Sequence, residues 1–140
     1  MKIQSDRFGV IETNEEDLIT FPEGIIGFFD EHTFVLLRHK DDSPIGWLQS
    51  TTTAWLALPV VSVESLAYEM DLNALEAASF SPNTHSVMVV LHAQSPAGPT
   101  VNMLAPIVVN AKTRIGHQVI ALGGAEVPFV LRQEAAAEAA

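Results

Sequence analysis

Short runs of β-branched and aromatic residues recur about every ten residues in this sequence, and turn-forming residues separate them. Alternation of apolar and polar residues is clearest in residues 17–21 and 46–50, and further runs occupy residues 33–37, 58–63, 87–91 and 107–109. Turns are predicted at residues 9, 22–24, 41–44, 81–83, 95–99, 114–116 and 123–124. Such short connections favour antiparallel pairing, because parallel strands need longer crossovers. The sequence therefore predicts a mainly β single domain, a small antiparallel β-barrel or a sandwich-like fold.

The segment VNMLAPIVVN at residues 101–110 contains no charged residue and has a proline in its middle. Ten residues are too few to cross a bilayer, which takes about 20, so the segment is expected to lie inside the protein. Pro106 lacks an amide hydrogen and disfavours helix at the preceding residue, which predicts two consecutive strands that bend at the proline, as at a barrel corner. Asn102 and Asn110 are expected to bond to neighbouring loops or turns. Gly116 is assigned to the turn that follows.

Residues 71–78 depart from the strand pattern. Good helix formers with Leu72, Leu75 and Ala78 on one stripe predict one short helix there, which Asp71 or Asn73 can cap. Residues 132–140 also favour helix, but nine residues fall below the roughly 12 to 15 that make an isolated helix stable. We therefore expect a domain over residues 1–131 and a frayed tail over residues 132–140.

The charge of the chain restricts its partners. Seventeen Asp and Glu oppose seven Lys and Arg, for a formal net charge of −10. Such a surface repels phosphate backbones, so direct nucleic-acid binding is disfavoured, and basic or apolar partners are expected. Residues 1–42 hold ten of the acids and four of the bases. A solvated surface explains any single acid equally well.

The cellular location is expected to be the cytoplasm, away from the membrane. The N-terminal residues lack the apolar core of a signal peptide, and the chain contains no cysteine. Without cysteine, disulfides, thiolate zinc sites and cysteine nucleophiles are excluded.

Several blocks in a fixed order resemble the FliW family of bacterial flagellar assembly factors. They are the opening residues 1–9, FPEGIIGF at 21–28, WLQS at 47–50, YEMDL at 68–72, VNMLAPIVVN at 101–110 and GHQVI at 116–120. Each block is modestly specific by itself, whereas the ordered set, which spans residues 1 to about 130, is a strong signal.

The resemblance implies a cytoplasmic regulator with a β-barrel-like fold, no catalysis and no cofactor. Members of this family bind CsrA, a basic dimeric RNA-binding repressor of translation, and relieve its repression of flagellin synthesis. They also bind flagellin itself. The partners implied are therefore CsrA and flagellin, with no small-molecule substrate.

Two groups of residues are candidates for these contacts. An amphipathic helix of flagellin would need an exposed apolar groove, and a basic partner would need exposed acids. The candidates are Phe21, Glu23, Ile25, Ile26, Phe28, Phe29, Glu64, Glu69 and Asp71. Residues 21–24 could also be a simple turn, with proline at its second position and glycine at positive φ.

The sequence departs from the family pattern at two places. The family usually has a second proline where Ile26 stands, so a less rigid and slightly more apolar loop is expected. Pro59 interrupts a segment that the family writes as a continuous strand, which predicts an edge strand there.

Two alternatives stay open from the sequence. One is a chaperone whose single client is flagellin. The other is a small barrel enzyme of cupin type that binds metal through its five histidines, His32, His39, His85, His92 and His117. No HExxH or His-x-His pattern supports a metal site, and no G-x-S-x-G pattern supports a serine nucleophile.

Overall fold

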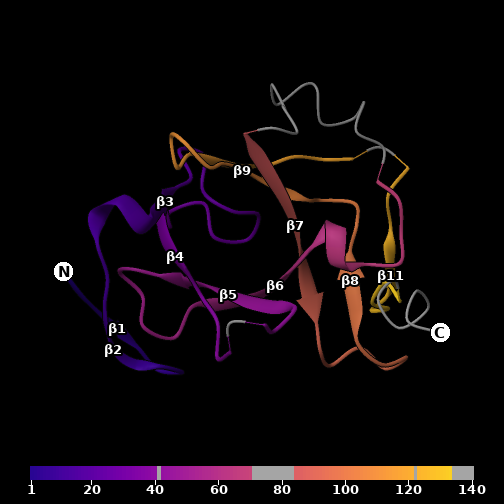
Figure 1. Cartoon of the computed structure of the whole chain (residues 1–140), viewed down its shortest axis with the longest axis horizontal. Coiled ribbons are helices and arrows are strands. Elements are labelled where there is room, and N and C mark those ends of the chain that lie inside the picture. The colour runs from indigo at the N-terminus through magenta and orange to yellow at the C-terminus, as the bar shows by residue number, and fades with distance from the viewer. Residues whose placement is uncertain (41, 71–83, 122, 134–140) are drawn as a thin grey trace.

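The computed structural model describes residues 1–40, 42–70, 84–121 and 123–133, and these are almost entirely strands and their connections (Figure 1). The strands are β1 (Lys2–Ser5), β2 (Gly9–Glu12), β3 (Leu18–Thr20), β4 (Thr33–Leu37), β5 (Ile45–Ser50), β6 (Ala57–Ser62), β7 (His85–His92), β8 (Thr100–Asn102), β9 (Ile107–Asn110), β10 (Gly116–Gln118) and β11 (Glu126–Pro128). Two short 3-10 helices, η1 (Glu15–Asp17) and η2 (Val63–Ser65), accompany them. No helix in these ranges is long and apolar enough to cross a membrane.

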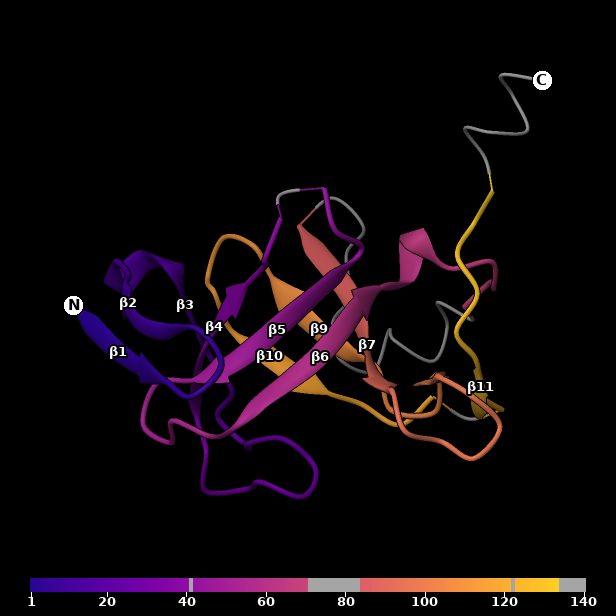
Figure 2. The same ribbon diagram turned by 90° about the horizontal axis from the view of Figure 1, so that it is seen from below.

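A strongly curved antiparallel sheet forms the body of the protein, in the order β10-β9-β7-β6-β5-β4-β3 (Figure 2). Strand β8 continues the pairing along β7, and β11 pairs with β8. The predicted mainly β, antiparallel, sandwich-like fold is confirmed. The barrel form is wrong, because in the described part of the chain the edge strands β3 and β10 meet through one isolated bridge, between Thr20 and Ile115, rather than through a ladder.

The two faces of the sheet carry separate apolar clusters, as the two-residue period of a strand requires. The inner cluster gathers alternate residues of the strands with three residues of the connections, and consists of Ile19, Phe21, Ile25, Phe34, Leu48, Leu56, Val60, Met88, Ile107 and Val109. The outer cluster contains Val61, Leu66, Val89, Leu91, Val101 and Met103, packed against side chains such as Tyr68, Val127 and Phe129. The segment that contains β11 thus covers one end of the outer face.

An N-terminal hairpin, β1 with β2, covers the other end of the outer face, and the run pattern did not predict it. Its anchor is Gln49, whose side chain is fully buried. Ser5 donates its hydroxyl to Gln49 Oε1 at 2.7 Å, and Gln49 Nε2 donates to the carbonyls of Ser50, Thr53 and Ala54. A buried amide needs such partners, so Gln49 fixes the hairpin and the following loop together.

The proline break in residues 101–110 is confirmed. Strands β8 and β9 both pair with β7, but they are separated at residues 103–106. The two asparagines act in the same way: Asn102 Oδ1 accepts from the amides of Leu104 and Ala105, and Asn110 Oδ1 accepts from those of Lys112 and Thr113. Each asparagine therefore closes a turn at the end of its strand.

Two local predictions are wrong. Strand β6 is not an edge strand, because it pairs with β5 on one side and with β7 on the other. Pro59 is tolerated because pairing with β7 begins only at Val60, so that Pro59 has a paired neighbour, Trp47, on the β5 side alone. Gly116 is not a turn residue either. It begins β10, and the preceding turn places Arg114 at φ 59°.

The predicted helix at 71–78 lies outside the described residues, as does most of the predicted tail. The first residue of that tail is held by a hydrogen bond: the amide of Arg132 donates to the carbonyl of Ser65 at 2.8 Å.

Candidate partner-binding surface

The loop at residues 21–31, which connects β3 to β4, is anchored in the inner core. Phe21 is fully buried, and its ring meets that of Phe34 edge to face at 5.5 Å. The predicted turn at its start is confirmed, since the amide of Gly24 donates to the carbonyl of Phe21 at 2.9 Å and Gly24 has φ 72°. Gly24 also permits close packing, because a Cβ atom there would lie 2.5 Å from the carbonyl oxygen of Phe29.

Only part of the predicted apolar set is available to a partner. Phe21 and Ile25 are 0% and 1% exposed, so their assignment to an exposed groove is wrong: both fill the core beneath the loop. Phe28 is half-buried and packs against the same core. Ile26 and Phe29, in contrast, are 48% and 64% exposed.

Trp55 joins these side chains, and the sequence analysis did not single it out. It is 65% exposed, and its ring lies 6.1 Å from that of Phe28. Its position in the sequence could have indicated an exposed aromatic side chain, because a tryptophan follows the short run TTTA, which is typical of a solvated turn. We call Ile26, Phe28, Phe29 and Trp55 the loop patch.

Gln118 of β10 holds the tip of the loop. Its Oε1 accepts from the amide of Ile26 at 2.8 Å, and its Nε2 donates to the carbonyl of Ala105 at 3.0 Å. A proline at position 26 could not donate this hydrogen bond. The side chain of Gln118 therefore connects the loop to the proline break.

Carboxylates border the loop patch. Glu23, Asp30 and Glu31 belong to the same loop, and no lysine or arginine occurs between Arg7 and Arg38. Glu23 Oε1 lies 3.1 Å from Nδ1 of His117, a contact between a largely exposed carboxylate and a partly buried imidazole. An apolar surface with this border favours a partner that carries both apolar and basic side chains.

Hydroxyl groups hold Glu31 in place. Hydrogen bonds from Thr53 first, and then from Thr52 and Ser50, lower the pKa of the Glu31 carboxyl below its usual value, against an opposing effect of burial. Thr52 Oγ1 donates to Oε2 at 3.1 Å and Ser50 Oγ donates to Oε1 at 3.3 Å. These bonds join the loop to the segment that precedes Trp55.

The lowered pKa of Glu31 predicts a pH dependence of stability. The folded protein favours the ionised carboxylate, so this contribution is complete above the unfolded pKa and is lost as pH falls toward the lower folded pKa. We expect the free energy of unfolding, measured in urea from pH 7 to pH 3, to fall less steeply in Glu31→Gln than in the parent protein. Asp30→Asn, at a neighbour with no hydroxyl contact among the described residues, should keep the parent slope. Equal slopes in Glu31→Gln and the parent would contradict the assignment.

Two of the predicted acidic residues, Glu64 and Glu69, do not lie beside the loop patch. Glu64 lies in η2 and Glu69 follows it, and both are exposed. Figures 1 and 2 both place η2 on the side of β7 and β11, away from the loop between β3 and β4. Asp71 lies outside the described residues. The structure thus separates the apolar candidates from Glu64 and Glu69.

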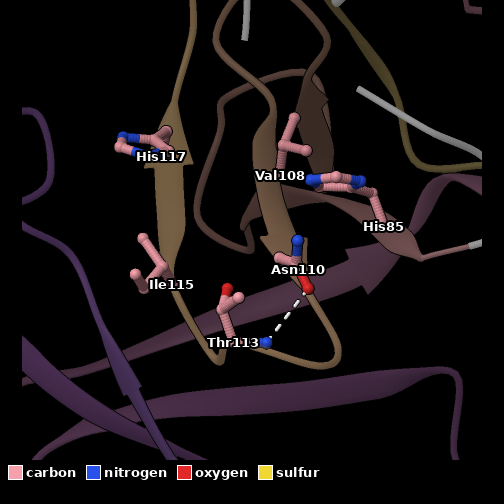
Figure 3. A pocket seen from close by; sticks show the side chains of 6 residues that line it. All are labelled: His85, Val108, Asn110, Thr113, Ile115 and His117. Atoms are coloured by element: carbon pink, nitrogen blue, oxygen red, sulfur yellow. Dashed lines mark hydrogen bonds between the residues drawn. The ribbon is translucent and has the colours of Figure 1, made fainter. Parts of the chain in front are cut away.

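A shallow hollow on the outer face of β7, β9 and β10 has one histidine at each side, with Val108 of β9 between them (Figure 3). Its lining consists of His85, Val108, Asn110, Thr113, Ile115 and His117. His85 Nδ1 is within 3.1 Å of the Thr84 hydroxyl, and His117 contacts Glu23. In the described ranges, no group of three or more His, Cys, Asp or Glu side chains is arranged to hold a metal ion.

Comparison with known proteins decides the family. The model of the FliW protein family matches residues 2–129. The chain belongs to the FliW family. A flagellar assembly factor FliW of Desulfitobacterium hafniense (strain DSM 10664 / DCB-2) is 39% identical over 127 residues, which cover 86% of this chain and 83% of that protein. The FliW of Bdellovibrio bacteriovorus (strain ATCC 15356 / DSM 50701 / NCIMB 9529 / HD100) is 34% identical and is covered over 72% of its length, again with 86% of this chain.

The fold agrees with this family. A crystal structure of the flagellar assembly factor FliW superposes with a TM-score of 0.74 at 29% sequence identity, over 96% of this chain and 100% of that chain. The structure also explains four of the FliW-like sequence blocks. Gln49 of WLQS anchors the N-terminal hairpin, while Gln118 of GHQVI joins FPEGIIGF to VNMLAPIVVN.

Proposed function

We propose that this protein is a regulatory binding protein of flagellum assembly that binds flagellin and CsrA, and that binding of CsrA relieves repression of flagellin synthesis. Membership of the FliW family supports a role in flagellar assembly. The exposed apolar loop patch on a protein of charge −10 is the observation that favours binding over catalysis.

The loop patch is the proposed contact for flagellin. Ile26, Phe29 and Trp55 are each about half exposed or more, so their apolar surface is open to a partner. The anchored base of the loop presents them without large rearrangement, so little ordering entropy opposes binding. An amphipathic helix that places its apolar stripe here would bring its basic side chains near Glu23, Asp30 and Glu31.

The exposed acids on the other side are the proposed contact for CsrA. Glu64 and Glu69 add to a strongly negative field, and a basic partner would be attracted by it and associate faster at low salt. Because the Debye length is about 8 Å in cellular salt, the repulsion of RNA would act only close to the bound surface. Two separate surfaces also allow both partners to be tested independently.

The decisive experiment is binding of purified flagellin to an Ile26→Ser/Phe29→Ser variant. Both changes remove exposed apolar surface, so the fold should be kept while the dissociation constant rises at least about tenfold, the equivalent of about 1.4 kcal/mol. Phe28 is unsuitable for this purpose because it also supports the core. Val10→Ser, at a 61% exposed valine on β2, is the matched control and should bind flagellin as the parent does.

The same proteins should be titrated with CsrA at two salt concentrations. We expect the parent and the loop variant to bind CsrA equally, with weaker and slower binding at higher salt. Failure of the parent to bind CsrA at low salt, with flagellin binding intact, would favour the chaperone with flagellin as its single client. Unchanged flagellin binding in the loop variant would contradict the role of the loop patch.

A further inference from the structure

A groove on the outer face of the sheet is left open between the two covers of that face. Ile45 and Val61 pack in the outer cluster at one end, while Gln49 lies beneath the N-terminal hairpin at the other. Between them, Trp47 of β5 and Pro59 of β6 are directly opposite each other in register. Both are only partly buried, so the middle of the sheet face is available to a ligand.

Two adjacent hollows at this place make up the groove. One hollow is lined by Asp6, Arg7, Ala54, Trp55 and Ala57. A second shares Arg7 and Ala57 and extends over Trp47, Pro59 and Leu91 to His92 and Glu126. The floor is therefore largely aromatic and aliphatic; Asp6 and Glu126 belong to one hollow each, and Arg7 lines both.

Arg7 gives the groove its chemical character. Its guanidinium carbon lies 3.8 Å from the ring centre of Trp47, a cation–π contact that fixes the side chain over the floor. No carboxylate lies within ion-pair distance of Arg7 in the described ranges, although Asp6 stands next to it at the mouth. At the far border Glu126 is already bonded, to His92 at 2.7 Å and to the hydroxyl of Thr100. The fixed cation is thus unpaired, while the far acid is paired.

We propose that this groove, which we call the Arg7 groove, binds an extended apolar segment of a partner protein whose carboxylate pairs with Arg7. A guanidinium held flat on an indole still presents its N–H edge, which matches a carboxylate by two parallel hydrogen bonds. Grooves lined by aromatic residues and proline suit extended, proline-containing segments, which lose little entropy on binding. The Arg7 groove shares Trp55 with the loop patch, but the proposal goes beyond the proposed function, because the groove also carries a cation, Arg7, that the loop patch lacks.

The chain offers a direct probe of this groove. It contains two tryptophans, and both of them, Trp47 and Trp55, line the groove. Binding of capped octapeptides that contain proline, leucine and one central glutamate can therefore be followed by intrinsic fluorescence. We expect saturable binding, weakened at least about tenfold when the glutamate is replaced by glutamine or lysine. Arg7→Gln should remove the preference for glutamate, and Lys112→Gln, at an exposed lysine in the turn after β9, should keep it.

The test can also reject the proposal. Arg7→Gln should keep the fold of the parent, because the backbone amide of Arg7, and not its side chain, donates to the Ser5 hydroxyl at 3.2 Å. Equal affinity for the glutamate, glutamine and lysine peptides would overturn the proposal. Unchanged preference in Arg7→Gln would overturn it too, as would the absence of a saturable fluorescence change with any peptide.

Discussion

Replacement of Phe21 by alanine is expected to lower the free energy of unfolding by about 3–5 kcal/mol, the usual range for an aromatic side chain removed from a core. The Phe21 ring is fully buried, meets Phe34 edge to face, and lies against Gly116 of β10. It therefore supports the loop, β4 and β10 at once, so the cavity left by alanine cannot be closed by movement of one element alone. Urea unfolding followed by circular dichroism measures the change.

The matched control for this experiment is Phe29→Ala in the same loop. Phe29 is 64% exposed, so its loss should change the free energy of unfolding by less than about 0.5 kcal/mol. Similar losses in the two variants would show that the division of this loop into a buried base and an exposed patch is wrong.

Gly116→Ala is expected to lower the free energy of unfolding by about 1–3 kcal/mol, the range for an overfilled core. An added Cβ would lie 2.5 Å from Cε2 and 2.8 Å from Cζ of Phe21, closer than atoms can approach. Phe21→Leu removes these ring atoms, so the double variant should be more stable than the sum of the two single changes predicts. Thermal and urea unfolding of the four proteins measure this coupling.

Gly98→Ala provides a comparison in which no such coupling is expected. Gly98 has φ 97° and no heavy atom within 4 Å of an added Cβ, so alanine there strains the backbone but meets no neighbour. Its effect should add to that of Phe21→Leu. Additive behaviour at Gly116 would mean that the glycine is required for another reason than the approach of the Phe21 ring.

Local patterns were sufficient where the structure depends on neighbouring residues along the chain. The run at residues 33–37 coincides with β4 (Thr33–Leu37), because alternation and β-branched composition act within the strand itself. The turns at Asn102 and Asn110 were predictable for the same reason, since an asparagine side chain bonds to amides two and three residues ahead.

Long-range packing decided what the sequence pattern missed. Phe21 and Ile25 resemble exposed loop residues in the sequence, yet the curvature of the sheet leaves an opening over the inner core that they fill. Pro59 suggested an edge strand because the offset start of pairing with β7 is not visible in β6 alone. Likewise, Trp55 and Gln118 joined the candidate surface through contacts between residues that are far apart in the chain.

The side-chain amide of Gln118 makes one hydrogen bond through its oxygen and one through its nitrogen. Its oxygen is bound to the tip of the loop and its nitrogen to the carbonyl that precedes Pro106. A ligand that lifts Ile26 away from β10 would break its hydrogen bond to Gln118. The side-chain amide of Gln118 could then rotate, and its hydrogen bond to the carbonyl of Ala105 would be less restrained. Binding that displaces the tip of the loop would therefore also loosen the backbone beside Pro106.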